Sequence, residues 1–509
     1  MASVEKIADA ITSVISRTPK NSVSTGAGSE ARLHDAEHGE EEQRQEQDKK
    51  LVRKLDMTLL PVLILMCLFQ AVDKSLLSIA KINGIEPDLH LTTHQFNVSI
   101  MVFQAGYLTL QLPSNLLITR VRPSIYLSTC CLLWSTVATC HALVHSYSQL
   151  LAVRLLLGCC DAPFFVGALH LLSSWYTRSE LTKRTSILLG VLVVTLTFMG
   201  PMCAGIVGGL EGLNGWRGWR WCYLVFGVGG VVVAGLGWVL LPDYPEGGGR
   251  FWLGSGEAEV ARRRMREDRV GEKVVERRKL WVGCRDAVGD VRVWIFVLMF
   301  MSRKSLEGLY YYEYAIIQSL HLFPSSPVSP QTLTLILGSP PALVAAILAF
   351  IGAYTSDRFS ERTYHITIPL LIALIGLIIS AATLDSAARY VAMYLWLAGS
   401  VAGTALAWSW VANSIQETPE KKAVGLAIVN VLSGLGGIWA PFLFRGQDAP
   451  GYRLAFGVLS GFVVVDVGCC LVMRWVLGRM NVRLRRGEEE RRGGEGEGER
   501  EGNGNLYVL

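Results

Sequence analysis

The sequence is poor in charged residues and contains long stretches with almost none. Only 18% of its 509 residues are Asp, Glu, Lys or Arg, whereas soluble globular domains carry about 25%. The charges gather in residues 1–55, 243–292 and 474–501, and between these ranges lie runs of about 20 residues that are nearly free of charge. This distribution disfavours a soluble enzyme, a secreted disulfide scaffold and a nucleic-acid-binding protein.

Motifs that would power or catalyse a reaction are also missing. The sequence has no G-x-x-x-x-G-K-[ST] loop for nucleotide phosphates, no G-x-S-x-G nucleophile elbow and no helix with Arg at every third position. Most of the 11 cysteines lie inside apolar runs, where they act as small hydrophobic residues. We therefore expect no enzyme activity, no catalytic residues, no cofactor and no metal, and any transport must draw on an ion gradient.

Hydrophobic residues make up 51% of the chain, and its mean hydropathy is +0.35. A helix that spans a bilayer needs about 20 apolar residues, so twelve such helices would use roughly half of the chain. Twelve apolar segments are predicted: 56–78, 95–118, 124–144, 150–172, 184–208, 220–241, 292–315, 332–355, 364–384, 389–412, 422–444 and 453–477. The prediction is an all-α membrane protein that contacts the lipid bilayer along most of its length.

The spacing of these segments divides the chain into two similar halves. We predict a disordered cytoplasmic tail at 1–50, a six-helix half at 51–242, a cytoplasmic central loop at 243–291, a second six-helix half at 292–478 and a disordered cytoplasmic tail at 479–509. Two six-helix halves are the architecture of major facilitator transporters.

The positions of Lys and Arg predict the orientation in the membrane, because short cytoplasmic loops carry an excess of both. Cations stand on both outer sides of the helical region: Lys49, Lys50, Arg53 and Lys54 before the first helix, and Arg479, Arg483, Arg485 and Arg486 after the last. The short loops show the same bias more weakly. Both termini are therefore predicted to be cytoplasmic.

Charged residues inside the first and fourth segments are candidate site residues, since a charge at the centre of a membrane helix costs about 2.5–3.5 kcal/mol. Asp73 and Lys74 lie near the end of the first segment, where they form either a gate or coupling pair or interfacial side chains that reach toward water. Arg154 and Asp161 lie nearly two turns apart on one face of the fourth. They form either a substrate or proton site or a purely structural link.

The seventh segment has the most unusual composition. Arg303 and Glu307 stand at i,i+4 and Lys304 and Glu307 at i,i+3, so either cation can meet the carboxylate. The cation that is left over, together with Tyr310 and Tyr311, could hold an organic anion by charge and stacking. If the true helix is shifted along the sequence, these groups are instead interfacial.

Specific motifs resemble the fungal anion:cation symporters, the allantoate permease group of the major facilitator superfamily. Most of them lie in the first half, and the similarity covers roughly residues 50–478. The motifs are Asp73-Lys74-Ser75, the run from Ala80-Lys81-Ile82 to Pro87-Asp88-Leu89, Pro113-Ser114-Asn115, Ala152-Val153-Arg154 with Gly158, Ser174-Trp175-Tyr176, and Ser356-Asp357-Arg358.

This resemblance implies an alternating-access carrier that takes up a small organic anion, such as a vitamin, a ureide or another carboxylate, with protons across the plasma membrane. It implies that Asp357 and Arg358 gate the cytoplasmic side. The basic residues Arg154, Arg303 and Lys304 would attract the anion, and Asp73, Asp161 or Glu307 would carry the proton. The expected partners are therefore a small molecule and a proton, with no nucleic acid.

The sequence also departs from the group's pattern, which leaves two other functions open. Lys74 replaces the usual arginine, Asp161 stands where the group usually has Glu, and Gly200-Pro201 with Gly205 is faintly similar to an antiporter signature. These differences would suit an exporter of a fungal secondary metabolite. A non-transporting nutrient sensor is the second alternative, and the long N-terminal tail is the feature that favours it.

Overall fold

The computed structural model describes residues 26–118, 120–245, 252–270, 280–359, 361–415 and 418–494, and within these ranges every regular element is a helix. The chain divides into two units, residues 1–55 and 56–509. The prediction of an all-helical protein is thus confirmed for the part of the chain that the structure describes.

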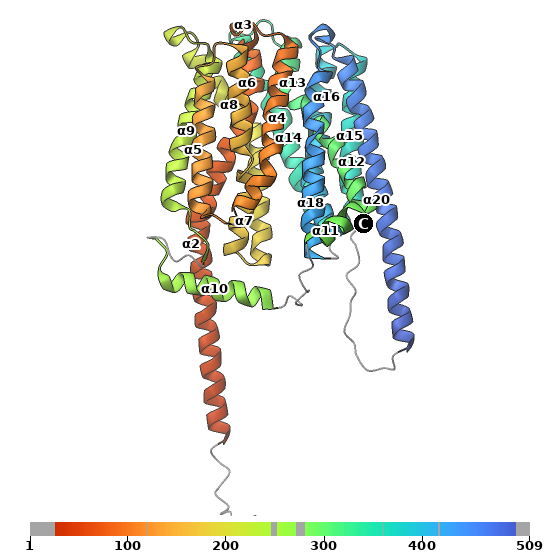
Figure 1. The fold of residues 1–509 in the computed structure, drawn as a ribbon. Helices are drawn as coiled ribbons and strands as arrows, with labels where there is room; N and C mark the ends of the chain where they lie inside the picture. The colour runs from red at the N-terminus through yellow and green to blue at the C-terminus, as the bar shows by residue number, and fades with distance from the viewer. Residues whose placement is uncertain are drawn as a thin grey trace, which may run out of the picture. The chain divides into compact units, whose positions relative to one another are not determined.

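In the described residues, the first half consists of α3 to α9 and the end of the longer α2, whose arrangement Figure 1 shows. Their bounds are α2 (Gly26–Ile82), α3 (Ile85–Asp88), α4 (Thr93–Ile118), α5 (Pro123–His141), α6 (Tyr147–Asp161), α7 (Phe164–Trp175), α8 (Arg178–Leu210) and α9 (Gly218–Leu240). The local sequence explains where some of these helices begin. Thr177 and Glu180 form a capping box at α8, and Ser146 accepts a hydrogen bond from the Gln149 backbone at α6.

The central segment forms α10 (Ser255–Val270) and α11 (Leu280–Val288), and the second half follows. Its α-helices are α12 (Val291–Leu306), α13 (Gly308–Ser319), α14 (Pro330–Phe359), α15 (Thr363–Ala382), α16 (Ser386–Ala402), α17 (Thr404–Ser414), α18 (Pro419–Gly434), α19 (Gly436–Trp439) and α20 (Arg453–Gly494). A short 3₁₀ helix, η3 (Ala440–Leu443), follows α19 directly. Figure 1 places α3 and α10 at opposite ends of the helices, which we call the α3 end and the α10 end.

Two predicted tails differ from the structure where it describes them. Helix α2 begins at Gly26, inside the range 1–50 for which disorder is predicted, and α20 continues to Gly494, inside the predicted tail 479–509. Glu, Gln, Lys and Arg dominate both helical extensions and are good helix formers. An i,i+4 ion pair of 2.8 Å between Glu46 and Lys50 supports the first of them. Residues 1–25 and 495–509 lie outside the described residues.

Four of the predicted apolar segments are interrupted rather than continuous. Helices α6 and α7 are separated at Ala162-Pro163, α12 and α13 at Glu307, α16 and α17 at Gly403, and α18 and α19 at Leu435. Interrupted helices free backbone groups at membrane depth and are common where transporters bind substrates. The predicted segments run through all four of these positions without a break.

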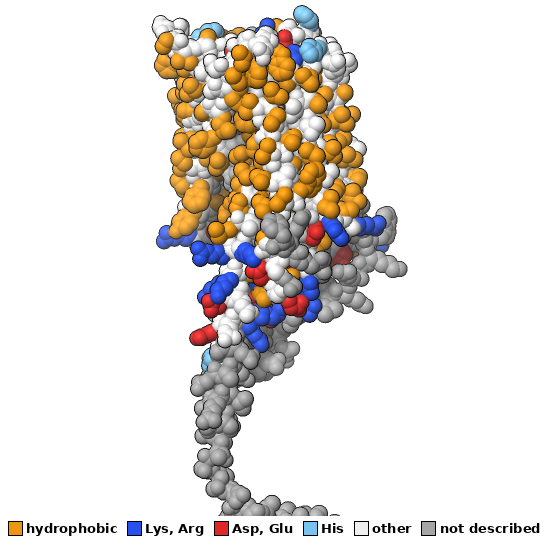
Figure 2. Space-filling model, turned by 90° about the vertical axis from the view of Figure 1, so that its left-hand side faces the viewer, with side chains coloured by type: hydrophobic (Ala, Val, Ile, Leu, Met, Phe, Trp, Pro, Cys, Tyr) orange, Lys and Arg blue, Asp and Glu red, His pale blue; other side chains and the backbone are white. Residues whose placement is uncertain are grey.

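Nine stretches in the described residues are long and apolar enough to cross a membrane. Three predicted segments, 95–118, 124–144 and 292–315, are helical but are not among the nine. The last of them carries Arg303, Lys304, Glu307 and Glu313, which explains its low hydropathy. Figure 2 shows exposed apolar side chains as a broad band. Val228, Val232 and Val239 of α9 are among the exposed apolar residues. Exposed apolar area on this scale is typical of a surface that faces lipid.

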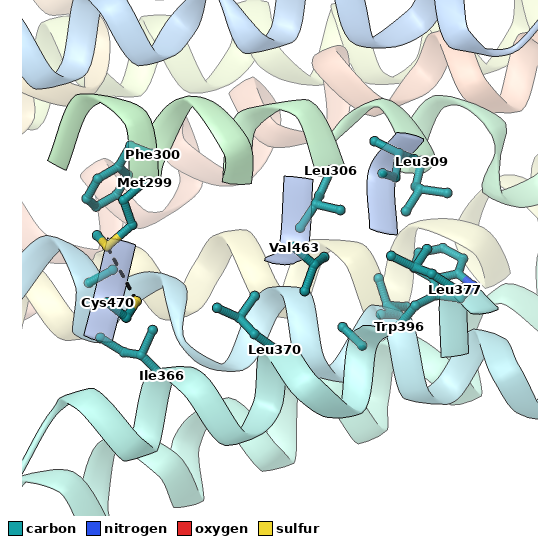
Figure 3. Close-up of a cluster of buried hydrophobic side chains, with 14 of the residues drawn as sticks. Met299, Phe300, Leu306, Leu309, Ile366, Leu370, Leu377, Trp396, Val463 and Cys470 are labelled. Atoms are coloured by element: carbon teal, nitrogen blue, oxygen red, sulfur yellow. Dashed lines mark hydrogen bonds between the residues drawn. The ribbon is translucent and has the colours of Figure 1, made fainter. Parts of the chain in front are cut away.

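Buried apolar side chains form a cluster in each half, and the first-half cluster also includes Tyr314 of α13 and Leu335 of α14. In the second half, side chains from α12, α15, α16 and α20 interlock (Figure 3), including Phe300, Leu370 and Trp396. The Cys470 thiol lies 3.6 Å from the Met299 sulfur at one end of this cluster.

Contacts between the halves are made by a few helices only. Helix α8 packs on α14, and α4 packs on α18 and α19. Gly200 of α8 permits the first contact, because a Cβ there would lie 2.3 Å from the Leu335 carbonyl oxygen of α14. Gly200 belongs to the Gly200-Pro201 pair that is faintly similar to an antiporter signature. In the structure it has a packing role.

Candidate functional site

A cavity of about 150 Å³ lies between the two halves. Helices α2 and α4 supply one wall, and α12, α13, α18 and α19 supply the other. It is lined by Lys74, Phe103, Gln104, Tyr107, Leu108, Gln111, Lys304, Glu307, Gly308, Tyr311, Asn430, Gly434 and Gly437. Aromatic walls with a few convergent polar groups are typical of small-molecule sites.

Close helix packing brings the two walls together. A Cβ on Gly434 would lie 2.4 Å from a methyl carbon of Leu108, and one on Gly437 would lie 2.5 Å from the amide nitrogen of Gln104. A larger residue at either position would have to displace the ends of the Leu108 and Gln104 side chains, so glycine favours the close approach of α18 and α19 to α4. Both glycines line the cavity.

The first half places Lys74 at the cavity in an ion pair with Asp161. The Lys74 Nζ atom lies 3.0 Å from an Asp161 carboxylate oxygen, and that carboxylate is only 1% exposed. Gln70, one turn before Lys74, donates a 2.9 Å hydrogen bond from its side chain to the Asp161 backbone oxygen. These contacts fix α2 against the end of α6, next to the helix break at Ala162-Pro163.

The other two predicted charges of the first half lie behind the cavity wall. Arg154 is fully buried, donates from Nε to the Ser99 carbonyl oxygen at 3.3 Å and lies over the Phe103 ring at 4.5 Å. Asp73 is also buried, and neither of its carboxylate oxygens has a hydrogen-bond partner in the described residues. Asp161, which the sequence placed on one face with Arg154, makes its ion pair with Lys74 instead.

In the second half, Glu307 pairs with Lys304 and not with Arg303, the two alternatives that the sequence left open. Lys304 lies 2.7 Å from Glu307 and donates a hydrogen bond to it, as expected for an i,i+3 pair. Arg303 lies 3.1 Å from Asp466 of α20, and both side chains are buried, at 5% and 0% exposure. The expected surplus cation is therefore not found, because Arg303 already has a carboxylate partner on another helix.

Glu307 occupies the interruption between α12 and α13. Gly308 follows it and packs against Ala440, where a Cβ on the glycine would lie 2.8 Å from the Ala440 Cβ. The break places the Glu307 carboxylate at the cavity with 38% of its side chain exposed, in contrast to the buried Asp161. Of the two predicted tyrosines, Tyr311 lines the cavity, whereas the Tyr310 hydroxyl lies 3.4 Å from the Ser400 hydroxyl.

Sequence reasoning missed the polar face of α4. Gln104, Tyr107 and Gln111 line the cavity together at helical spacing, and Tyr107 lies 4.9 Å from the Lys74 ammonium. Asn430 contributes a second carboxamide from α18. The signal that would have found them is the stripe of polar side chains at i, i+3 and i+7 in a predicted membrane helix.

At the α3 end the two halves are joined directly. The Asn97 amide of α4 donates to the Phe444 carbonyl oxygen at 3.3 Å and accepts a hydrogen bond from the Tyr312 hydroxyl. The Tyr312 ring stacks on Phe444 at 4.4 Å, and the Lys81 ammonium lies over the rings of Phe96 and Tyr312. These contacts connect α4 with α13 and with Phe444, which follows η3.

At the α10 end, the predicted gating residues Asp357 and Arg358 are exposed at the end of α14. The neighbouring Glu361 makes the contacts to other helices, to Arg474 of α20 at 2.8 Å and to His365 at 3.2 Å. Asp357 and Arg358 therefore form no ion pair across helices in this conformation, among the residues that the structure describes.

Each half has a carboxylate that fastens helix ends at the α10 end. Asp56 binds Arg184 through two oxygens at 2.7 and 2.6 Å. Asp290 binds Arg292 at 2.6 Å and Lys421 at 2.8 Å. Burial by itself would raise the pKa of Asp290, but the hydrogen bonds from Arg292 and Lys421 outweigh it and lower this pKa to about 2.

Comparison with known proteins agrees with this arrangement. The family model of the Major Facilitator Superfamily matches residues 62–441. The MFS-type transporter cnsO of Penicillium expansum is 30% identical over 458 residues, which are 88% of this chain and 85% of that protein. The Major facilitator-type transporter hxnP of Emericella nidulans is 27% identical over 421 residues, which are 80% and 81% of the two chains.

Solved structures share the fold at low sequence identity. The inward open conformation of the xylose transporter XylE from E. coli superposes with a TM-score of 0.62 at 14% identity, over 82% of this chain and 94% of that one. A bacterial homolog to the human lysosomal transporter Spinster gives a TM-score of 0.61 at 16% identity, over 81% of this chain and 94% of that one.

The family model covers most of the chain, the helical fold agrees with it, and the cavity lies between the halves. The chain therefore belongs to the Major Facilitator Superfamily and is a multi-pass membrane transporter.

Proposed function

We propose that this transporter takes up a small organic anion together with a proton across the plasma membrane. The observation that carries the proposal is the pair of lysines in the cavity. Lys74 comes from the first half and Lys304 from the second, and each is neutralised by a carboxylate at a helix interruption. In such a cavity, a lysine can exchange its carboxylate partner from the protein for the carboxylate of a substrate.

The exchange couples the proton to the anion. Lys304 and Glu307 neutralise each other when the cavity is empty. Protonation of Glu307 removes its negative charge and leaves the Lys304 ammonium without a partner in a poorly solvated site, which is costly. A substrate carboxylate restores the balance, so that proton and anion bind together and leave together. With one proton for each monovalent anion, the cycle moves no net charge.

The remaining wall residues suit an anion with a polar or planar body. Tyr107 and Tyr311 offer ring faces and hydroxyl groups, and Gln104, Gln111 and Asn430 offer carboxamides that both donate and accept hydrogen bonds. Such groups position a small substrate between the two lysines. The resemblance to the allantoate permease group supports the same class of substrate.

The proposed cycle is alternating access, with twelve membrane-spanning helices and both termini in the cytoplasm. The positive charges flanking the apolar segments support this orientation, and it makes the α3 end extracellular. The contacts of Asn97 with Tyr312 and Phe444 then form the closed outer gate. They involve only a few hydrogen bonds, each with a net value of about 1 kcal/mol, so that the gate can open and close.

The test is flux into proteoliposomes against a panel of labelled carboxylates with an imposed proton gradient. We expect one substrate to accumulate with an inward proton gradient, and an uncoupler to abolish the accumulation. A potential imposed without a proton gradient should drive little uptake, because the proposed cycle is electroneutral.

The Lys304→Gln variant should raise the KM for the anion strongly, whereas Lys183→Gln, which removes an exposed lysine on α8, should transport normally. Unchanged kinetics in Lys304→Gln would remove this site from the proposal. Accumulation of the substrate only with an outward proton gradient would favour export instead.

A further inference from the structure

A groove of about 650 Å³ runs along one face of α20 at the α10 end, away from the substrate cavity. It is lined by Leu471, Arg474, Trp475, Gly478, Arg479, Val482, Arg483 and Arg486. Leu471 and Trp475 are exposed on the part of α20 that carries the apolar surface. The helix then continues with the exposed Arg479, Arg483 and Arg486, so the groove changes from apolar to basic along its length.

The three arginines form a single stripe. Arg479, Arg483 and Arg486 stand at i, i+4 and i+7, which places them on one face of the helix, and Trp475 continues this face one turn earlier. The Arg479 guanidinium lies over the Trp475 ring at 3.7 Å. This stacking orients the guanidinium edge, with its hydrogen-bond donors, outward from the helix.

The charges of this stripe are not neutralised in the described part of the chain. Arg474, at the start of the groove, binds Glu361 at 2.8 Å and lies over the Tyr364 ring at 4.4 Å. Arg479, Arg483 and Arg486 make no ion pair with any carboxylate whose side chain the structure describes. Three aligned guanidinium groups therefore face outward beside an exposed tryptophan.

We propose that this stripe binds an anionic phospholipid of the leaflet at the α10 end. The order of residues along α20 matches the order of groups in a lipid. Leu471 contacts the acyl chain, Trp475 lies at the interface, where tryptophan is enriched, and the arginines bind the headgroup phosphate and its negative charge. Charge complementarity selects this ligand over a zwitterionic lipid, because basic residues beside a membrane attract anionic headgroups. The inference does not depend on what the cavity transports.

The test is lipid binding by the purified full-length protein, measured by native mass spectrometry during titration with phosphatidylserine or phosphatidylcholine. The variant Arg479→Gln/Arg483→Gln/Arg486→Gln should bind phosphatidylserine more weakly by roughly tenfold or more, and its phosphatidylcholine binding should not change. The variant with Lys at the three positions should retain most of the preference. The control variant Arg445→Gln/Arg453→Gln, which removes two exposed arginines outside the groove, should bind like the wild type.

Three results would overturn the proposal. The first is an unchanged preference for phosphatidylserine in the Gln variant. The second is an equal loss in the control variant, which would show a general effect of net charge. The third is competition by glycerol 3-phosphate at equal concentration, which would show that the groove recognises a free phosphate rather than a lipid. If the triple variant does not fold, Arg483→Gln alone should still reduce phosphatidylserine binding.

Discussion

The two halves of this transporter place their charges differently around one cavity. Each half presents a lysine with a carboxylate partner, and each keeps an arginine buried behind it. In the second half the arginine, Arg303, has a carboxylate from another helix. In the first half Arg154 has only a backbone oxygen and an aromatic ring, and Asp73 has no hydrogen-bond partner in the described residues.

This difference shows where the site can rearrange. Buried polar groups without partners are rare and are often found where a structure stores strain or changes its contacts. In the first half, Asp73 has no hydrogen-bond partner and Arg154 has no carboxylate partner among the described residues, and neither side chain lines the cavity. The second half is closer to charge balance, and its exposed carboxylate, Glu307, is the one that solvent in the cavity can reach. We infer that Glu307 exchanges the proton and that the first-half charges respond to it.

The largest effect is expected when the ion pair between Arg303 and Asp466 in the second half is broken. Asp466→Asn leaves Arg303 buried without a counter-charge and should lower the free energy of unfolding by about 3–5 kcal/mol. The double variant Arg303→Gln/Asp466→Asn should recover much of this loss. Thermal unfolding in detergent measures both.

Arg154→Gln is the matched variant in the first half and should cost only about 1–2 kcal/mol, because it removes a cation that has no carboxylate partner. An equal loss in Asp466→Asn and Arg154→Gln would contradict the distinction between the halves.

The second prediction separates the two carboxylates at the cavity. Glu307→Gln mimics the protonated state, so uptake driven by a proton gradient should be lost while exchange of labelled for unlabelled substrate continues. Asp161→Asn should reduce both activities, because it removes the buried partner that holds Lys74 in place. Counterflow and gradient-driven uptake in the same proteoliposomes distinguish these outcomes. Loss of exchange in Glu307→Gln would place the coupling proton elsewhere.

A third, smaller effect concerns the helix ends at the α10 end. The pKa of Asp290 is lowered to about 2 in the folded protein, against about 3.9 in an unfolded chain. A carboxyl group whose pKa is lower in the folded protein stabilises the fold at pH values above its unfolded-state pKa. This stabilisation is lost as the pH falls through the folded-state pKa. Asp290→Asn should therefore cost about 2 kcal/mol at pH 7 and progressively less between pH 4 and pH 2.

Thermal unfolding at pH 7 and pH 3 measures this change. Asp286→Asn, four residues earlier, removes a carboxylate that makes no ion pair in the described residues and serves as the control. A loss in Asp290→Asn that stays constant between the two pH values would show that the effect is not one of charge.

The smallest expected effect concerns the contact between the halves at the α3 end. Asn97→Ala removes hydrogen bonds to Tyr312 and Phe444, each with a net value of about 1 kcal/mol, and should favour the outward-open state. Hydrogen exchange should then become faster in α3 and at the start of α4. Thr92→Ala, which removes a local capping interaction nearby, should have no such effect on the contact. Slower exchange in Asn97→Ala would show that these bonds do not close the gate.

Much of the architecture follows from the sequence because it depends on local composition. Charge-poor runs of about 20 residues favour burial in lipid, and they predicted an all-helical membrane protein, in agreement with the helical structure and with the superfamily that the comparisons show. The pairing of Lys304 with Glu307 was among the sequence alternatives, since helix geometry alone brings i and i+3 together. The twelve spans, the orientation and the substrate stay predictions.

Tertiary structure decided the contacts between helices. Asp161 meets Lys74 rather than Arg154, Arg303 meets Asp466, and Glu361 rather than Asp357 binds a neighbouring helix. Such pairs depend on how far each helix is rotated about its axis and where it is interrupted. Rotation and interruption follow from the packing of glycines and large side chains along the whole interface. The sequence by itself determined which charges enter the membrane, and the packing decided which of them face each other and which face the cavity.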